Sequence, residues 1–152
     1  MGAAPDMHEL LNAAWAKADR AAALYLHSAS KLEPFDATRS WTADELEPYD
    51  ALVTRFERLI EVLLKFFRVV EAFETAGTGS TVRDCLALMT KLGLIEEVDA
   101  WMEMREVRNR IAHDYLPDNV GVIYSLLLNT YRPIVANAVA EAREYVRLSR
   151  ER

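Results

Sequence analysis

The chain has 152 residues, of which 51% are hydrophobic and 28% charged, a composition typical of a folded globular protein with a real core. Its net charge of −6 argues against broad, non-specific nucleic-acid binding, because such binding needs many Lys and Arg contacts to phosphates. Cys85 is the only cysteine, so an internal disulfide is excluded and a reducing, cytoplasmic location is expected. No apolar run approaches the ~20 residues that span a bilayer, and no signal-peptide pattern opens the chain.

The spacing of apolar residues predicts two long helices in the first half of the chain. Apolar residues recur at steps of three and four over residues 7–32, and the segment that begins at Glu33-Pro34 breaks this first helix. A loop is expected up to Pro48, although Thr42 and Glu45 have the spacing of a capping box. Pro48 suits a first helical turn, so the second helix is expected over residues 49–74.

Turn residues divide the second half into three further helices. Thr81 or Ser80 would cap a short helix that Gly93 ends, and a fourth helix is expected from about Glu96. The segment 116–119 should stop that helix, and Asp118 or Asn119 should cap the last one, which runs to about residue 148. Within it, Pro133 should kink or split the helix near Tyr131.

No segment alternates polar and apolar residues with the period of two that marks a strand. We therefore expect an all-α fold, an antiparallel up-and-down bundle of four or five helices with short connections. Residues 1–152 are expected to form a single domain.

The candidate functional segment is Met104–Tyr115, which reads M-R-E-V-R-N-R-I-A-H-D-Y. Arg108 can hold a phosphate through two parallel hydrogen bonds, and His113 can transfer protons. Arg105 and Arg110 make the segment locally basic within an acidic chain. A simpler interpretation is that Arg and His near a helix C-terminus complement the helix dipole.

Helical geometry predicts that the two main candidate residues, Arg108 and His113, point in different directions. At about 100° per residue, Arg108 lies at the edge of the core face, Asn109 and His113 lie on the solvent side, and Arg108 and His113 point about 140° apart. The predicted core face carries Ala100, Met104, Val107 and Ile111. Either the helix loosens before Pro117, or a second subunit completes the site. Because RNA cleavage needs both a base and an acid, two histidines in one cleft favour a homodimer.

The pattern Arg108-Asn109-x3-His113-x-Tyr115 resembles the R-x4-H-x-Y signature of HepT-like proteins in the HEPN superfamily. The stretch 49–115 is similar to the nucleotidyltransferase substrate-binding subfamily, for example at Leu92-Gly93-Leu94-Ile95. Asp114 departs from that pattern, where a small or hydroxylated residue is expected, and adds a negative charge beside His113.

The resemblance implies a HEPN-like bundle that forms a homodimer, needs no metal or other cofactor, and acts as the RNase toxin of a HEPN/MNT toxin–antitoxin module. It implies His113 as general acid and base, Arg108 on phosphate and Asn109 as the orienting residue. The implied partner is an MNT-type nucleotidyltransferase antitoxin, which in some members transfers AMP to the motif tyrosine, here Tyr115. The added bulk and negative charge would block RNA phosphate.

A second hypothesis keeps the partner but not the catalysis. The chain would be a subunit that binds nucleotide or substrate for a minimal nucleotidyltransferase, a hypothesis that the sequence pI of about 5.1 and the similarity to the substrate-binding subfamily keep open. A third is an oligomeric helical protein whose motif has decayed.

Other residues bear less directly on chemistry. Arg55 or Glu57 could border the cleft beside Arg105, Arg110 and Asp114, although a Glu57-Glu61-Lys65 charge ladder is the simpler interpretation of Glu57. His8 and His27 are far apart, and without H-x3-H or C-x2-C spacing no metal site is expected. Packing is the expected role of Trp15, Trp41 and Trp101.

Overall fold

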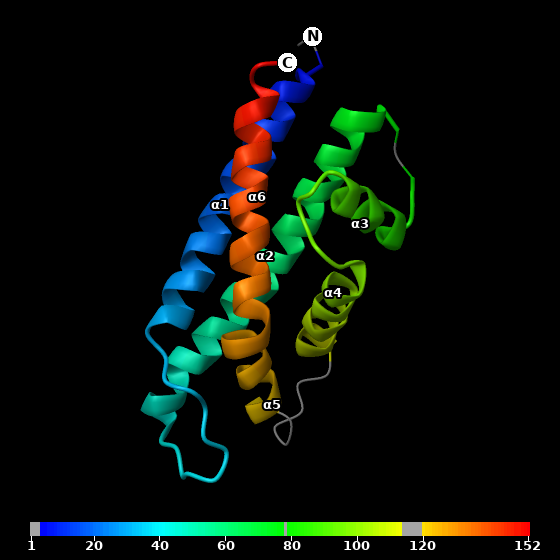
Figure 1. The fold of residues 1–152 in the computed structure, drawn as a ribbon. Coiled ribbons are helices and arrows are strands. Elements are labelled where there is room, and N and C mark those ends of the chain that lie inside the picture. Colours follow the sequence, from blue (N-terminus) through cyan, green and yellow to red (C-terminus); the bar gives the residue numbers. More distant parts are fainter. Residues whose placement is uncertain (1–3, 78, 114–119) are drawn as a thin grey trace.

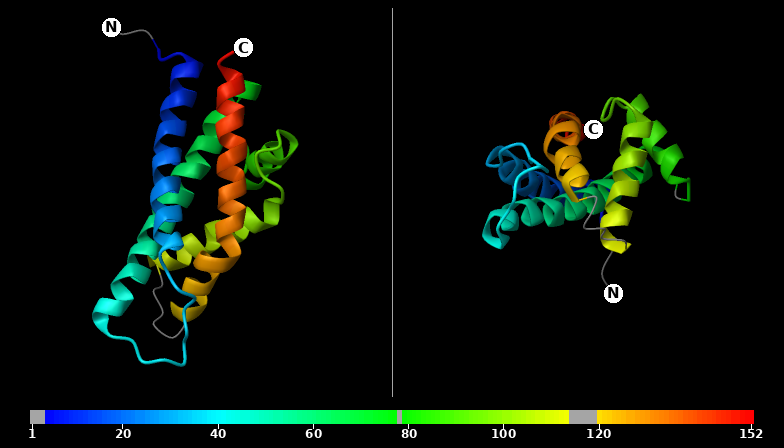
Figure 2. Two further views of the ribbon diagram at one scale, coloured as in Figure 1. Left: turned by 60° about the vertical axis from the view of Figure 1, so that its left-hand side comes forward. Right: turned by 90° about the horizontal axis from the view of Figure 1, so that it is seen from below.

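The computed structural model describes residues 4–77, 79–113 and 120–152, and all of its regular secondary structure over these ranges is helical (Figure 1). The elements in chain order are α1 (Met7–Ser30), α2 (Ala43–Thr75), α3 (Val82–Lys91), α4 (Val98–His113), α5 (Val120–Ser125), the π-helical segment η2 (Leu126–Thr130) and α6 (Tyr131–Ser149). Neighbouring long helices run antiparallel, as predicted. Helices α1, α2 and α6 form the long body of the bundle, and α3 and α4 lie on one side of it (Figures 1 and 2).

Helix α2 begins earlier than the sequence analysis predicted. Thr42 and Glu45 form the complete capping box, in which the Glu45 amide donates to Thr42 Oγ1 over 3.2 Å and the Thr42 amide donates to Glu45 Oε1 over 3.2 Å. The prediction that Pro48 lies in the first turn was therefore wrong. Pro48 lies inside the helix, where its missing N–H leaves only the carbonyl of Asp44 unpaired, and Asp44 is exposed to water.

The predicted boundaries of α3 are confirmed. Thr81 caps the helix, and its Oγ1 accepts a 3.0 Å hydrogen bond from the amide of Asp84. The helix ends at Lys91, and Gly93 follows with φ of +81°, a left-handed conformation that favours glycine. This turn leads into Leu94 and Ile95, whose buried side chains anchor the link to α4.

The last helix is split where Pro133 predicted a disturbance. In η2 each backbone hydrogen bond spans one residue more than in an α-helix: the amide of Tyr131 donates to the carbonyl of Leu126, five residues earlier. Since Pro133 has no N–H for the carbonyl of Asn129, the regular ladder is already interrupted at this point. The predicted stop at 116–119 and the caps Asp118 and Asn119 lie outside the described residues.

The core lies between α1, α2 and α6 and continues beneath α4. Trp101 is 1% exposed and its indole packs edge-on against Phe67 at 5.3 Å between ring centroids, while Trp15 packs against Phe66. Both therefore have the packing role that was predicted. The core face of α4 is also largely as predicted: Met104, Val107 and Ile111 are buried, and Ala100 is half-buried at its edge. Within the described residues, no helix combines the length and apolarity needed to cross a membrane.

Candidate functional site

Helix α4 carries the candidate residues and remains regular through His113, its last residue. Its buried face packs on α2 and α3, which fixes the direction of every side chain on the helix. Arg108 and Asn109 are half-buried, whereas His113 is exposed. One continuous helix therefore carries Arg108 and His113 in the diverging directions that helical geometry predicts, and the helix does not loosen before His113.

The Arg108 guanidinium is held by its neighbour in the sequence. Arg108 Nη2 donates to Asn109 Oδ1 over 2.8 Å, and Arg108 Nε is buried without a hydrogen-bond partner among the residues that the structure describes. A buried guanidinium nitrogen with no acceptor is costly, so this arginine has hydrogen-bonding capacity that the isolated chain does not use. Asn109 thus restrains Arg108 and leaves it incompletely paired.

Glu57 on α2 lies close enough to Arg108 for their charges to interact across the α2–α4 contact. Partial burial raises the pKa of the Glu57 carboxyl above its usual range, and the positive charge of Arg108 only partly offsets this rise. The ion pair of the charge ladder forms one turn away, where Lys65 Nζ is 3.1 Å from Glu61 Oε1. The structure therefore brings Glu57, rather than the rest of the ladder, to the candidate site.

Arg55 lies elsewhere. Its Nη1 donates to the carbonyl of Leu24 over 3.1 Å and to Ser28 Oγ over 2.7 Å, and both acceptors belong to α1. Arg55 thus ties α1 to α2, and the structure does not bring it to the α4 side.

The other two arginines of the motif point in different directions. Arg105 and Asn109 line a shallow groove of about 450 Å³ on the outer side of α4, together with Arg83 of α3. The carboxylates of Asp99, Glu103 and Glu106 line the same groove, so its charge is mixed. Arg110 is exposed and lies 3.6 Å from the carboxylate of Glu106. The three arginines of the motif therefore have different surroundings: Arg108 lies near Glu57 of α2, Arg105 lines the groove, and Arg110 faces solvent.

Two motif residues, Asp114 and Tyr115, lie outside the described residues. His8 is half-buried against Phe73, with 5.1 Å between ring centroids, and His27 lies in the last turn of α1. Over the ranges that the structure describes, no three His, Cys, Asp or Glu side chains gather in a way that could hold a metal ion.

Sequence reasoning missed a buried hydroxyl on the other flank of α4. Tyr131 of α6 is fully buried, and its hydroxyl lies beside the carboxylate of Glu103 without the geometry of a hydrogen bond. Burial, reinforced by the Glu103 charge, raises the pKa of Tyr131. No local signal marks this pairing, because it depends on how α6 lies against α4.

An all-helical bundle with Arg108, Asn109 and His113 on one helix end has the features of the HepT-like class within the HEPN superfamily. A family model described as "Nucleotidyltransferase substrate binding protein like" matches residues 21–144, and the chain belongs to this family. The match confirms the resemblance seen over residues 49–115 and extends it into the first and last helices. A comparison with curated proteins found no significant match.

Proposed function

We propose that this protein is a metal-independent endoribonuclease, the toxin of a HEPN/MNT toxin–antitoxin module, and that two subunits share its active site. The observation that carries the proposal is the state of Arg108: its guanidinium is restrained by Asn109, incompletely paired, and lies on the same helix as the exposed His113. A restrained, unsatisfied guanidinium suits a phosphodiester, which accepts two parallel hydrogen bonds.

The chemistry requires two proton transfers. A base removes the proton of the RNA 2′-hydroxyl, the 2′-oxygen attacks phosphorus, and an acid protonates the departing 5′-oxygen. The P–O5′ bond breaks as the P–O2′ bond forms, leaving a cyclic phosphate and a free 5′-hydroxyl. Each positioned proton transfer contributes roughly 10²–10⁴-fold, and Arg108 would stabilise the negative charge that builds on the non-bridging phosphate oxygens.

One chain supplies only part of this machinery. His113 is the single histidine of the motif, and it points about 140° away from Arg108 on a regular helix. A two-fold axis beside α4 would place the His113 of one subunit near the Arg108 of the other and provide both a base and an acid. The dimer is thus part of the proposed mechanism.

The proposed partner is a nucleotidyltransferase antitoxin, a class that the description of the matched family supports. Transfer of AMP to Tyr115, two residues after His113, would place a bulky anion where RNA phosphate has to bind.

The test is RNA cleavage in the presence of EDTA. The purified protein should cleave mRNA or tRNA without metal, and His113→Ala should lower the rate at least about 100-fold, the lower limit for one lost proton transfer. His27→Ala, which removes a histidine from the end of α1, should leave the rate unchanged. Equal cleavage by the wild type and His113→Ala would exclude a catalytic role for His113.

A second candidate function is a non-catalytic subunit that binds nucleotide or substrate for a nucleotidyltransferase. The specific observation in its favour is the mixed lining of the groove beside Asn109, where three carboxylates outnumber Arg83 and Arg105 and would weaken the binding of a long polyanionic RNA. This function predicts harmless expression without the partner, no RNA cleavage, and calorimetric binding of AMP or ATP that Arg108→Ala weakens.

A further inference from the structure

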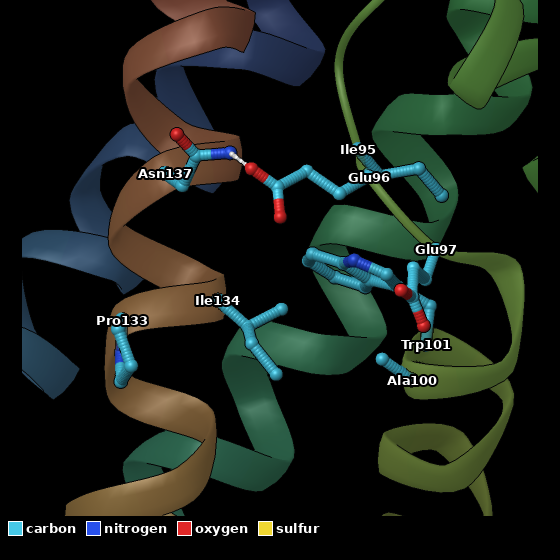
Figure 3. A pocket seen from close by; sticks show the side chains of 8 residues that line it. All are labelled: Ile95, Glu96, Glu97, Ala100, Trp101, Pro133, Ile134 and Asn137. Carbon is cyan, nitrogen blue, oxygen red and sulfur yellow. Dashed lines mark hydrogen bonds between the residues drawn. The ribbon is translucent and has the colours of Figure 1, made fainter.

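A cavity of about 420 Å³ opens between the start of α4, with the link before it, and the first turns of α6 (Figure 3). Figure 3 shows α2 behind it, the Trp101 indole projecting from α4 toward Ile134 of α6, and the Glu96 carboxylate on one side of that indole. Pro133 extends the apolar wall, and Glu96, Glu97 and Asn137 form the polar rim. The cavity therefore combines an apolar wall with a negatively charged mouth.

The two carboxylates at the mouth lack a cationic partner. Glu96 and Glu97 are exposed, and neither forms an ion pair within the part of the chain that the structure describes. The Asn137 amide donates to Glu96 Oε1 over 3.5 Å, a long contact that another donor can replace at little cost. Acidic residues before α4 complement its dipole, which accounts for their charge but not for the cavity that they border.

We propose that this cavity is a docking site for an arginine side chain of a partner protein. An arginine has an aliphatic stem that can pack along Pro133 and Ile134, next to the buried Trp101 indole, and a planar guanidinium that can reach more than one carboxylate. Arginine is also among the residues that most often anchor protein interfaces by filling a pocket. Lysine matches the charge but lacks the fork and the planar face.

The docking site is separate from the proposed catalytic site. Ala100 lines the cavity and Asn109 lines the groove on the outer side of α4. Nine residues separate them, about 900° of helical rotation, so they lie about 180° apart on the helix. Arg108 lies eight residues beyond Ala100, about 12 Å further along the helix, so a partner bound at the cavity does not cover Arg108. The proposal does not depend on ribonuclease activity.

The experiment follows Trp101 in the full chain by ¹H–¹⁵N NMR. The probe is the blocked peptide acetyl-Gly-Arg-Gly-amide, and Trp101→Phe assigns the indole N–H signal. Titration should shift this signal saturably, while the indole signals of Trp15 and Trp41, which do not line the cavity, stay in place. The same peptide with citrulline in place of arginine keeps the shape without the charge, and should bind at least about tenfold more weakly, as expected when charge-assisted hydrogen bonds are lost.

Matched variants test the carboxylates. Combining Glu96→Gln with Glu97→Gln should weaken peptide binding by about tenfold or more. Combining Glu9→Gln with Glu47→Gln removes the same charge from exposed positions outside the cavity and should change nothing. Thermal melts establish that both double variants are folded.

Four outcomes would overturn the proposal. The first is the absence of a Trp101 shift, and the second is equal binding of the arginine and citrulline peptides. The third is binding of agmatine but not of the peptide, which would assign the cavity to a free organic cation. The fourth is dissociation of a dimer in the Glu96→Gln, Glu97→Gln variant, which would assign this face to contact between two copies of the chain.

Discussion

Tyr25 on α1 donates a hydrogen bond to the main-chain carbonyl of Leu127, 102 residues further along the chain. Leu127 belongs to η2, where the wider helical turn changes the pairing of backbone carbonyls. The tyrosine hydroxyl thus gives a buried backbone carbonyl a partner and fixes the position of the last helix against the first. Burial raises the pKa of Tyr25, so this hydroxyl remains a donor throughout the neutral range.

Tyr25→Phe should lower the free energy of unfolding by about 1–2 kcal/mol, because it removes one partner of a buried hydrogen bond. Tyr131→Phe is the comparison: it removes an equally buried hydroxyl that lies beside Glu103 and, within the described residues, lacks a partner with the geometry of a hydrogen bond. This second change should cost less than about 0.5 kcal/mol or be stabilising. Urea unfolding measures both, and equal losses would contradict the role assigned to the Leu127 carbonyl.

Glu57→Gln should stabilise the protein at neutral pH. The folded protein raises the pKa of this carboxyl, so its ionisation opposes folding, and stability falls as pH rises from the usual Glu range through the raised value. The variant should therefore melt at a higher temperature than the wild type above that window and at a similar temperature below it.

Glu61→Gln provides the comparison for Glu57. Glu61 is exposed and paired with Lys65, so its replacement should change the melting temperature little. A difference between wild type and Glu57→Gln that is the same at every pH would rule out ionisation as its cause.

Cys85 should be unreactive in the folded protein. It is 3% exposed, and burial, with a smaller contribution from Glu71, raises the pKa of its thiol to about 11. At pH 8 the reactive thiolate is then about 0.1% of the total, by the relation between pKa and thiolate fraction. Reaction with a disulfide reagent should be at least about 100-fold slower in buffer than in 8 M urea. Comparable rates in the two conditions would show that α3 opens readily.

Two variants that are each inactive, Arg108→Ala and His113→Ala, should restore activity when one chain of each forms a mixed dimer. If Arg108 of one subunit acts with His113 of its partner, mixing Arg108→Ala chains with His113→Ala chains leaves one intact pair in each heterodimer. RNA cleavage should then rise above that of either variant alone but stay well below wild type, because random mixing makes about half of the dimers mixed and each mixed dimer keeps one histidine for the two proton transfers. A site contained within one chain predicts no recovery at any mixing ratio.

Local sequence signals predicted most helix boundaries, because short-range chemistry sets them. Thr81 with Asp84, Gly93 and Pro133 each act through their own backbone or a neighbour within a few residues, so their effects can be read without a tertiary structure. The start of α2 was misplaced because Pro48 was given more weight than Thr42, although the cap supplies the hydrogen bonds that begin the helix.

The candidate site was only partly predictable. Helical rotation gives the directions of Arg108 and His113, since both lie on one regular helix. Which neighbours Arg55 and Glu57 contact depends on which helix packs on each side of α2. The local sequence pattern does not specify that packing. The cavity beside Trp101 could not be predicted from the sequence either, because α4 and α6 border it from opposite sides.

The start of α1 and the end of α6 lie side by side, where Arg150 Nε donates to Asn12 Oδ1 over 3.2 Å. The C-terminal end of α4 and all of α5 lie toward the opposite end of the bundle (Figure 1). A circularly permuted chain could therefore join these two helix ends through a short linker and begin instead in the turn between α2 and α3. Such a permutant keeps every helix intact and reverses the order in which α1 and α4 are synthesised. It therefore tests whether the final structure depends on the order in which the helices are made.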